Sequence, residues 1–115
     1  MVVLVAIEPR FYRQVLGQTI QAKRPHVEVV VLDPDTLEAG LARLDPDLVF
    51  AYRPDAPAPT GRPAWVEFHP YEHPAARVCL AGRRWELSLV ELPDLLSIVD
   101  EAEEISRTAR EPGNR

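Results

Sequence analysis

Three short apolar runs rich in β-branched residues, at positions 2–7, 27–32 and 48–52, are separated by two segments with helical spacing. Runs of this length are typical of strands that are buried on both faces of a sheet. Strands that alternate with helices through short connections are usually parallel and joined by right-handed crossovers. We therefore expect an α/β fold with a partly parallel sheet, in which the first run is the central strand and the strand order is 2-1-3.

The helices between these strands have recognisable boundaries. Pro9 suits the start of the first helix, because proline lacks the N–H that would be unpaired in a first turn. This helix is predicted from about Arg10 to Lys23, with an apolar face that includes Phe11, Val15 and Ile20. The second helix is expected over residues 36–44, after a turn whose short oxygen-bearing side chains can cap it.

The pattern changes after Arg53. Residues 54–63 contain four prolines and a glycine and are predicted to form a loop. Residues 64–69 are expected to form a strand whose pairing direction the pattern leaves open. Period-two alternation in 77–80 and 85–90 predicts an antiparallel β-hairpin.

The last part of the chain is predicted to be an amphipathic helix. Its apolar residues recur at helical spacing from Leu92 to Ile105, so we expect this stripe to cover a sheet face. Residues 1–109 are expected to form a single domain, because 115 residues are enough for one ordinary core and too few for two. Residues 110–115, which include Pro112 and Gly113, are predicted to be a flexible tail.

Composition excludes several classes of partner. A net charge of −5 argues against nucleic-acid binding, which depends on clustered basic residues. No apolar run reaches the roughly 20 residues that a membrane span needs, and no basic leader precedes the first strand, so we expect a cytoplasmic protein without a membrane partner. The single cysteine, Cys79, lies in an apolar alternation and is expected to be a buried, inert thiol.

Residues 1–53 resemble the receiver domains of bacterial response regulators, which have a flavodoxin-like fold. The resemblance is carried by Val-Leu-Val-Ala-Ile-Glu-Pro at 3–9, Arg-Gln-Val-Leu at 13–16 and Pro-Asp-Leu-Val at 46–49. In that family an acidic pair after the first strand binds Mg²⁺, and an aspartate at the end of the third strand accepts a phosphoryl group. Here Ile7 stands beside Glu8, and Tyr52 stands at the acceptor position. The family's lysine near the fifth strand is also missing, so the resemblance implies a pseudo-receiver that does not transfer phosphate.

Candidate ligand-binding residues follow the carboxyl ends of the three parallel strands, where sites of open α/β sheets form. They comprise carboxylates, arginines and a phenol that could converge at one edge: Glu8, Arg10, Asp33, Asp35, Tyr52 and Arg53. The alternative is that they are solvated loop ends with one or two local ion pairs, which contribute little to stability.

One pair of histidines has a metal-like spacing. His69 and His73 are four residues apart, and imidazole is a common zinc ligand. Pro70 and Pro74 make the segment a turn rather than a helix, and no second pair of ligands follows. We therefore expect two turn histidines and no metal or other cofactor.

Aromatic residues gather in the second half of the chain. They are either the core beneath the hairpin or an exposed patch for a partner, since Trp and Tyr are common interface anchors. The residues are Trp65, Phe68, Tyr71 and Trp85.

The sequence contains no phosphate-binding loop, dinucleotide fingerprint or nucleophile elbow. Our leading expectation is a non-enzymatic regulatory or protein-interaction domain. The alternative is a small-ligand-binding protein or small enzyme that uses the edge with Glu8, Asp33, Tyr52 and Arg53. A third possibility is a homodimer formed through the hairpin edge or the last helix.

Overall fold

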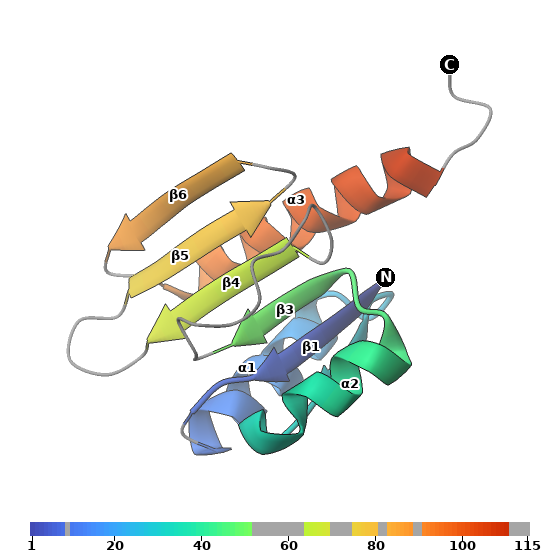
Figure 1. Ribbon diagram of the computed structural model, residues 1–115. Coiled ribbons are helices and arrows are strands. Elements are labelled where there is room, and N and C mark those ends of the chain that lie inside the picture. The colour runs from blue at the N-terminus through green and yellow to red at the C-terminus, as the bar shows by residue number, and fades with distance from the viewer. Residues whose placement is uncertain (9, 52–63, 70–74, 81–82, 89–90, 111–115) are drawn as a thin grey trace.

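A single six-stranded sheet in the order β2-β1-β3-β4-β5-β6 forms the middle layer of the molecule (Figure 1). The structure is a computed structural model that describes residues 1–8, 10–51, 64–69, 75–80, 83–88 and 91–110. The strands are β1 (Val2–Ala6), β2 (Glu28–Val31), β3 (Leu48–Ala51), β4 (Ala64–His69), β5 (Ala75–Leu80) and β6 (Arg83–Ser88).

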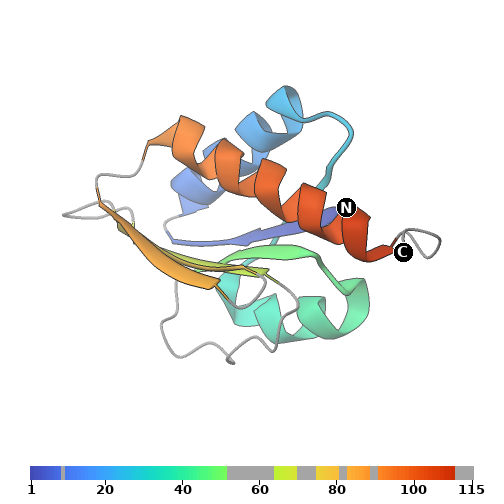
Figure 2. The ribbon, with the colours of Figure 1, turned by 90° about the horizontal axis from the view of Figure 1, so that it is seen from above.

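Helices cover both faces of this sheet. α1 (Arg10–Lys23) and α3 (Leu92–Arg110) lie on one face, and α2 (Leu37–Leu44), which follows the short 3₁₀ helix η1 (Pro34–Thr36), lies on the other (Figure 2). In the described part of the chain, no helix has both the length and the apolar character that crossing a membrane requires. The last residue of α3 is Arg110, which we had placed in the tail, and residues 111–115 lie outside the described chain.

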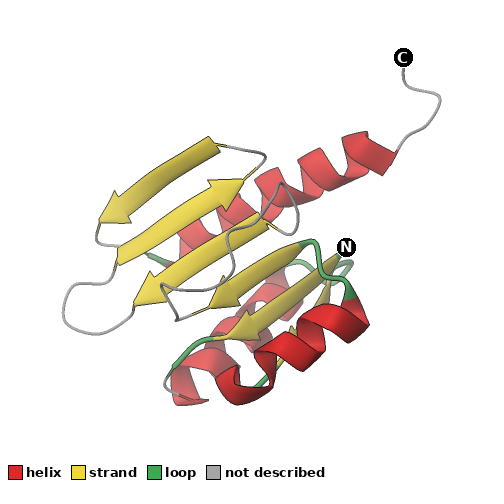
Figure 3. Cartoon of the chain, in the orientation of Figure 1, coloured by secondary structure: helices red, strands yellow, loops and turns green. Residues whose placement is uncertain are grey.

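The expected α/β class and the mixed sheet are confirmed (Figure 3). β1 pairs in parallel with β2 and β3, and β4 pairs in parallel with β3. β5 and β6 then continue the sheet with antiparallel pairing. Both hairpin strands begin two residues earlier than predicted, at Ala75 and Arg83, because backbone pairing extends beyond the apolar alternation.

The core has two parts, one on each sheet face. The larger cluster lies beneath α1 and α3 and includes Phe50, Phe68 and Val99, whereas the smaller lies beneath α2 and includes Val49 and Trp65. Trp65 and Phe68 are therefore core residues, Trp85 is half-buried, and Tyr71 lies outside the described residues. Cys79 is only partly buried at the margin of the smaller cluster, whereas the alternation predicted a buried thiol.

The buried stripe of α1 differs from its most apolar face. It consists of Arg13, Leu16, Gly17 and Ile20. Gly17 approaches β2 so closely that an added Cβ would lie 2.5 Å from a γ-methyl of Val31. A larger residue at this position would push the helix away from the strand. Of the predicted apolar face, Ile20 is buried in this stripe, whereas Phe11 is 74% exposed and Val15 is 42% exposed.

Asp47 connects three strands to the last helix. Its backbone N–H donates to the carbonyl of Val2 at 2.8 Å, and its own carbonyl accepts from the N–H of Ala64 at 3.0 Å. Its carboxylate accepts from the N–H of Val2 at 2.9 Å and from the hydroxyl of Ser106 at 3.1 Å. Because Asp47 is only 5% exposed, these bonds replace nearly all of the water that its carboxylate would otherwise bind.

Replacing this carboxylate is expected to destabilise the fold. Asp47→Ala leaves the N–H of Val2 and the hydroxyl of Ser106 without their acceptor, which should lower the free energy of unfolding by about 1–3 kcal/mol. Ser106→Ala removes one bond and should cost about 0.5–1.5 kcal/mol. Urea unfolding of both variants measures these losses in the free energy of unfolding. A loss for Asp47→Ala that is equal to or smaller than the loss for Ser106→Ala would contradict the prediction.

Candidate functional site

The carboxyl edge of the parallel strands contains several of the predicted residues, and local contacts occupy two of them. Glu8 follows β1 and accepts from Nη1 of Arg13 at 3.4 Å. Asp33 follows β2 and caps η1, with its carboxylate accepting from the N–H of Asp35 at 3.0 Å. Such a cap satisfies a donor that the helix itself leaves unpaired. Glu8 and Asp33 thus have different partners.

The remaining candidates at this edge lie in separate elements or outside the described residues. Arg10 is an exposed residue in the first turn of α1, and Asp35 is exposed in η1. Tyr52 and Arg53 lie outside the described residues, as does His73. His69 is the last residue of β4. Within the part of the chain that the structure describes, no three His, Cys, Asp or Glu side chains are grouped closely enough to hold a metal ion.

Arg13 is a residue of this edge that sequence reasoning missed. Its side chain is only 8% exposed and also donates to the carbonyl of Ile7 at 3.3 Å. The helical period could have revealed it, because Arg13 precedes the buried pair Leu16 and Ile20 by three and seven residues. The guanidinium holds the Glu8 carboxylate against the end of β1, which favours a structural role for that carboxylate.

The described residues form an apolar groove between the first turns of α1 and α3. We define the α1–α3 groove by its lining residues, which come from α1, the end of β4 and the start of α3. They are Phe11, Tyr12, Val15, Leu16, Phe68, Glu91, Leu92 and Leu95. Its volume is about 240 Å³.

Aromatic packing forms the floor of the groove. The rings of Tyr12 and Phe68 meet at a centroid distance of 5.7 Å and an angle of 58°, a tilted arrangement that favours contact between ring edge and ring face. Phe68 is 1% exposed, whereas Tyr12 is 37% exposed. The floor is thus fixed to the sheet while its outer side remains accessible.

The rim of the groove is unusually apolar for a protein surface. Phe11, Val15 and Leu92 are 74%, 42% and 38% exposed, respectively. Single exposed apolar residues are common, but a contiguous group around a concave surface indicates a binding site. Glu91 supplies a carboxylate and Tyr12 a hydroxyl, and the other six lining residues are apolar. The groove is therefore suited to receive apolar groups.

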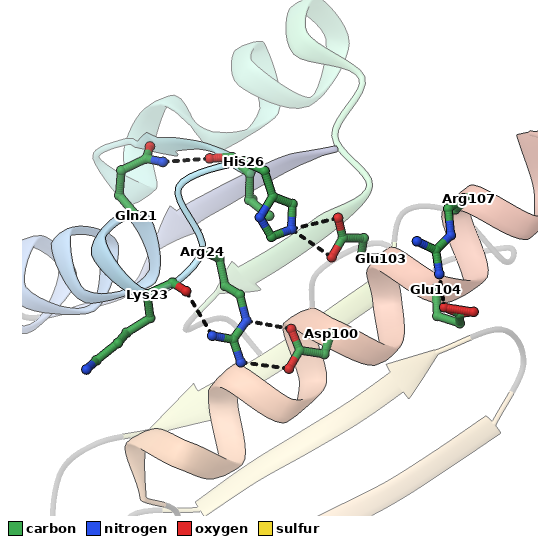
Figure 4. A network of polar contacts seen from close by, with 9 residues as sticks. Gln21, Lys23, Arg24, His26, Asp100, Glu103, Glu104 and Arg107 are labelled. Atoms are coloured by element: carbon green, nitrogen blue, oxygen red, sulfur yellow. Dashed lines mark hydrogen bonds and ion pairs between the residues drawn. The ribbon is translucent and has the colours of Figure 1, made fainter.

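Ion pairs connect α3 to the end of α1 beyond the groove (Figure 4). Arg24 donates through Nε and Nη2 to the two carboxylate oxygens of Asp100, at 2.6 and 2.8 Å. The imidazole Nε2 of His26 lies 2.8 Å from a carboxylate oxygen of Glu103. Arg107 pairs with Glu104 within α3. The two pairs between segments connect α3 to the chain that follows α1.

Comparison of the chain with protein-family models, curated proteins and solved structures gives no match.

The Arg24–Asp100 pair should make stability depend on acid pH. The hydrogen bond from Arg24 lowers the pKa of Asp100 below its ordinary value, so the folded state holds this carboxylate in its charged form more strongly than the unfolded state does. This contribution is present above the ordinary pKa of about 4 and is lost as pH falls through the lower folded value. The effect should be small, because the Asp100 side chain is 48% exposed and solvent screens the pair.

Asp100→Asn is the variant that isolates this contribution. Urea unfolding of both proteins between neutral pH and pH 3 should show a smaller acid-induced loss of stability in the variant. Glu104→Gln is the matched control on the same helix, because Glu104 pairs with Arg107 inside α3. Parallel pH profiles for the wild type and Asp100→Asn would contradict this assignment.

Proposed function

We propose that the chain is a non-enzymatic regulatory or protein-interaction domain that receives apolar side chains of a protein partner in the α1–α3 groove. The observation that carries this proposal is the exposure of Phe11, Val15 and Leu92 around a preformed apolar hollow. Phe11 is mostly exposed, and Val15 and Leu92 are partly exposed. Burying a fully exposed apolar side chain contributes about 1.5–3 kcal/mol, and completing the burial of these three contributes a part of that amount each, before the entropy cost of association.

The chemistry of the groove favours binding over catalysis. Its floor is an aromatic pair, and its one carboxylate, Glu91, lies at the start of α3. Interfaces commonly concentrate their binding energy in a few aromatic anchors surrounded by residues that exclude water. Phe11 has the exposure that such an anchor requires, and Tyr12 and Leu92 are placed to surround an inserted group.

A receiver-like origin of the first half is part of this proposal. The helices on both faces and the arrangement of β2, β1 and β3 support it. Where the resemblance calls for an acidic pair, Ile7 is fully buried and Glu8 is bound by Arg13. A buried aliphatic side chain cannot ligate Mg²⁺, which prefers oxygen ligands. The pseudo-receiver proposed here therefore acts by binding and not by phosphoryl transfer.

The same groove supports a second candidate function, the binding of a small apolar ligand. The specific observation is its volume of about 240 Å³ together with its largely apolar lining. Small-molecule sites are usually apolar hollows with a few polar groups that fix orientation, but most are larger. A protein partner explains the exposed Phe11 better, since this side chain extends well outside the hollow.

The absence of phosphoryl transfer is directly testable. Incubation with acetyl phosphate and Mg²⁺ followed by intact-mass measurement should show no phosphoryl adduct, because the described start of the edge lacks the acidic pair that would bind the metal. A functional receiver domain treated in the same way is the positive control. Stoichiometric modification of this chain would contradict the pseudo-receiver proposal.

Binding in the groove is testable with a displayed library of random peptides selected on the immobilised chain. Selected peptides should contain apolar anchors and should lose most of their affinity for Phe11→Ser. Gln14→Ser is the matched control, because Gln14 is exposed on the same helix and does not line the groove. Neither substitution should change the free energy of unfolding by more than about 0.5 kcal/mol, since both side chains are exposed.

The peptide selection and a thermal-shift screen together distinguish a protein-interaction domain from a protein that binds a small apolar ligand. A thermal-shift screen of small apolar compounds that gives a Phe11-independent, Leu95-dependent stabilisation, with no peptide selected, would favour the ligand-binding alternative. Peptide binding that is equal in Phe11→Ser and Gln14→Ser would exclude the groove as the interaction surface.

A further inference from the structure

The two edge strands of the sheet, β6 and β2, differ in how strongly their sequences resist the addition of another strand. β6 has Arg83, Arg84 and Glu86 among its six residues. β2 has the sequence Glu-Val-Val-Val, with one charged residue, Glu28. Residues 27–32 around it, Val-Glu-Val-Val-Val-Leu, contain no proline or glycine. Segments of this composition add further strands readily when they lie at an open edge, so β2 needs a protection other than charge.

The hydrogen bonds of β2 show which of its backbone groups face away from the sheet. The N–H of Glu28 donates to the carbonyl of Met1 at 3.0 Å, so the even-numbered residues of this segment bond to β1. Alternate residues of a strand direct their N–H and C=O groups to opposite sides. The outward groups at this edge therefore belong to Val27, Val29 and Val31.

The end of α1 supplies partners for the first of these outward groups. The carboxamide of Gln21 donates through Nε2 to the carbonyl of Val27 at 2.7 Å (Figure 4). Its Oε1 accepts from the N–H of Val29 at 3.4 Å. The carbonyl of Arg24 accepts from the N–H of Val27 at 2.9 Å. Three outward groups of the edge are thus bonded to the last turn of α1 and the residue that follows it.

The packing of α1 explains why Gln21 reaches this edge. Gly17 lets the helix approach β2 so closely that an added Cβ would lie 2.5 Å from a γ-methyl of Val31. Gln21 follows Gly17 by four residues, so the two lie on the same side of the helix. The close contact at Gly17 therefore places the Gln21 side chain beside the backbone at the start of β2.

The Gln21 carboxamide reproduces the hydrogen bonds of a neighbouring strand. In a parallel pair, a residue of the neighbour donates to a carbonyl on one side of its partner residue and accepts from an N–H on the other side. Gln21 makes both bonds, on either side of Glu28, from one planar amide. A strand that approached this edge would need the same two backbone groups. It could pair there only after the Gln21 side chain had moved away.

We propose that Gln21 is an autoinhibitory contact that closes the β2 edge to strand addition. The strand that it excludes is the segment 27–32 of a second copy of the chain, because identical β-branched segments pair through their backbones in register. Beyond Gln21, the outward groups of β2 are the carbonyl of Val29 and the N–H and carbonyl of Val31. Pairing confined to these groups would form a very short ladder, and very short edges are poor templates.

Hydrogen exchange measured by NMR tests the contact itself. Gln21→Ala removes the acceptor of the Val29 N–H and keeps a strong helix former, so this amide should exchange about two- to tenfold faster. The N–H of Glu28, which binds β1, is the internal control and should keep its rate. An unchanged rate at Val29 would overturn the proposal. Equal acceleration of both amides would also overturn it, because Gln21 would then hold β2 on the sheet without specifically covering its edge.

Self-association of the full chain tests the consequence. In shaken solutions followed by thioflavin T fluorescence, which reports cross-β structure, Gln21→Ala should reach half-maximal signal sooner than the wild type. Gln18→Ala is the matched control, because Gln18 is exposed on the same helix, and it should keep the half-time of the wild type. A Gln21→Ala variant with the half-time of the wild type would overturn the closing role.

A charge added to β2 tests whether association proceeds through this edge. Val31 is 40% exposed, and a charged side chain on an edge strand opposes pairing. Adding Val31→Lys or, separately, Val31→Glu to Gln21→Ala should therefore restore the half-time of the wild type. Thermal unfolding identifies the double variants that remain folded. A folded double variant that associates as fast as Gln21→Ala would overturn β2 as the edge that Gln21 protects.

Discussion

The buried carboxylate of Asp47 is the interaction on which the arrangement of the elements most depends. It joins the start of β1 to the last turns of α3, while the backbone of the same residue joins β1 and β4 to β3. Burying a carboxylate is costly unless hydrogen bonds satisfy its oxygens. The fold is therefore stabilised only by arrangements of the strands and α3 that keep these hydrogen bonds. Asp47 thereby sets the position of α3 along the sheet. The far end of that helix, at Leu92, forms one wall of the α1–α3 groove.

Much of the fold could be predicted from local patterns. The class and the bounds of α1 followed from the length of the apolar runs, the position of Pro9 and the helical spacing. The direction of β4 could not be predicted, because its parallel pairing with β3 joins residues far apart in the sequence and produces no local sequence pattern. The outward turn of Phe11 was also missed. Hydrophobicity assigned that residue to the core, whereas the small size of Gly17 determines which face of α1 meets β2.

The candidate site was less predictable than the fold. The residues at the ends of the parallel strands could be identified from the sequence, but their hydrogen-bond and ion-pair partners could not. Asp33, for example, caps the helix η1. The α1–α3 groove combines α1, the end of β4 and the start of α3, so it exists only once the helices are placed on the sheet. Phe68 was recognised as part of an aromatic group without any indication that it would form the floor of a hollow. The ion pair between Arg24 and Asp100 spans 76 residues and left no pattern in the sequence.

One of the two edge strands of the sheet, β6, affects how the molecule behaves in concentrated solution. β6 ends the sheet and has the charged residues Arg83, Arg84 and Glu86 at three of its six positions, and Arg83 also lies over the ring of Trp85. Charged side chains on an edge strand oppose the addition of a foreign strand and so protect against amyloid-like growth. At this edge, molecules in concentrated solution are expected to meet through side chains, and such contacts can dissociate more readily than a continuous backbone ladder.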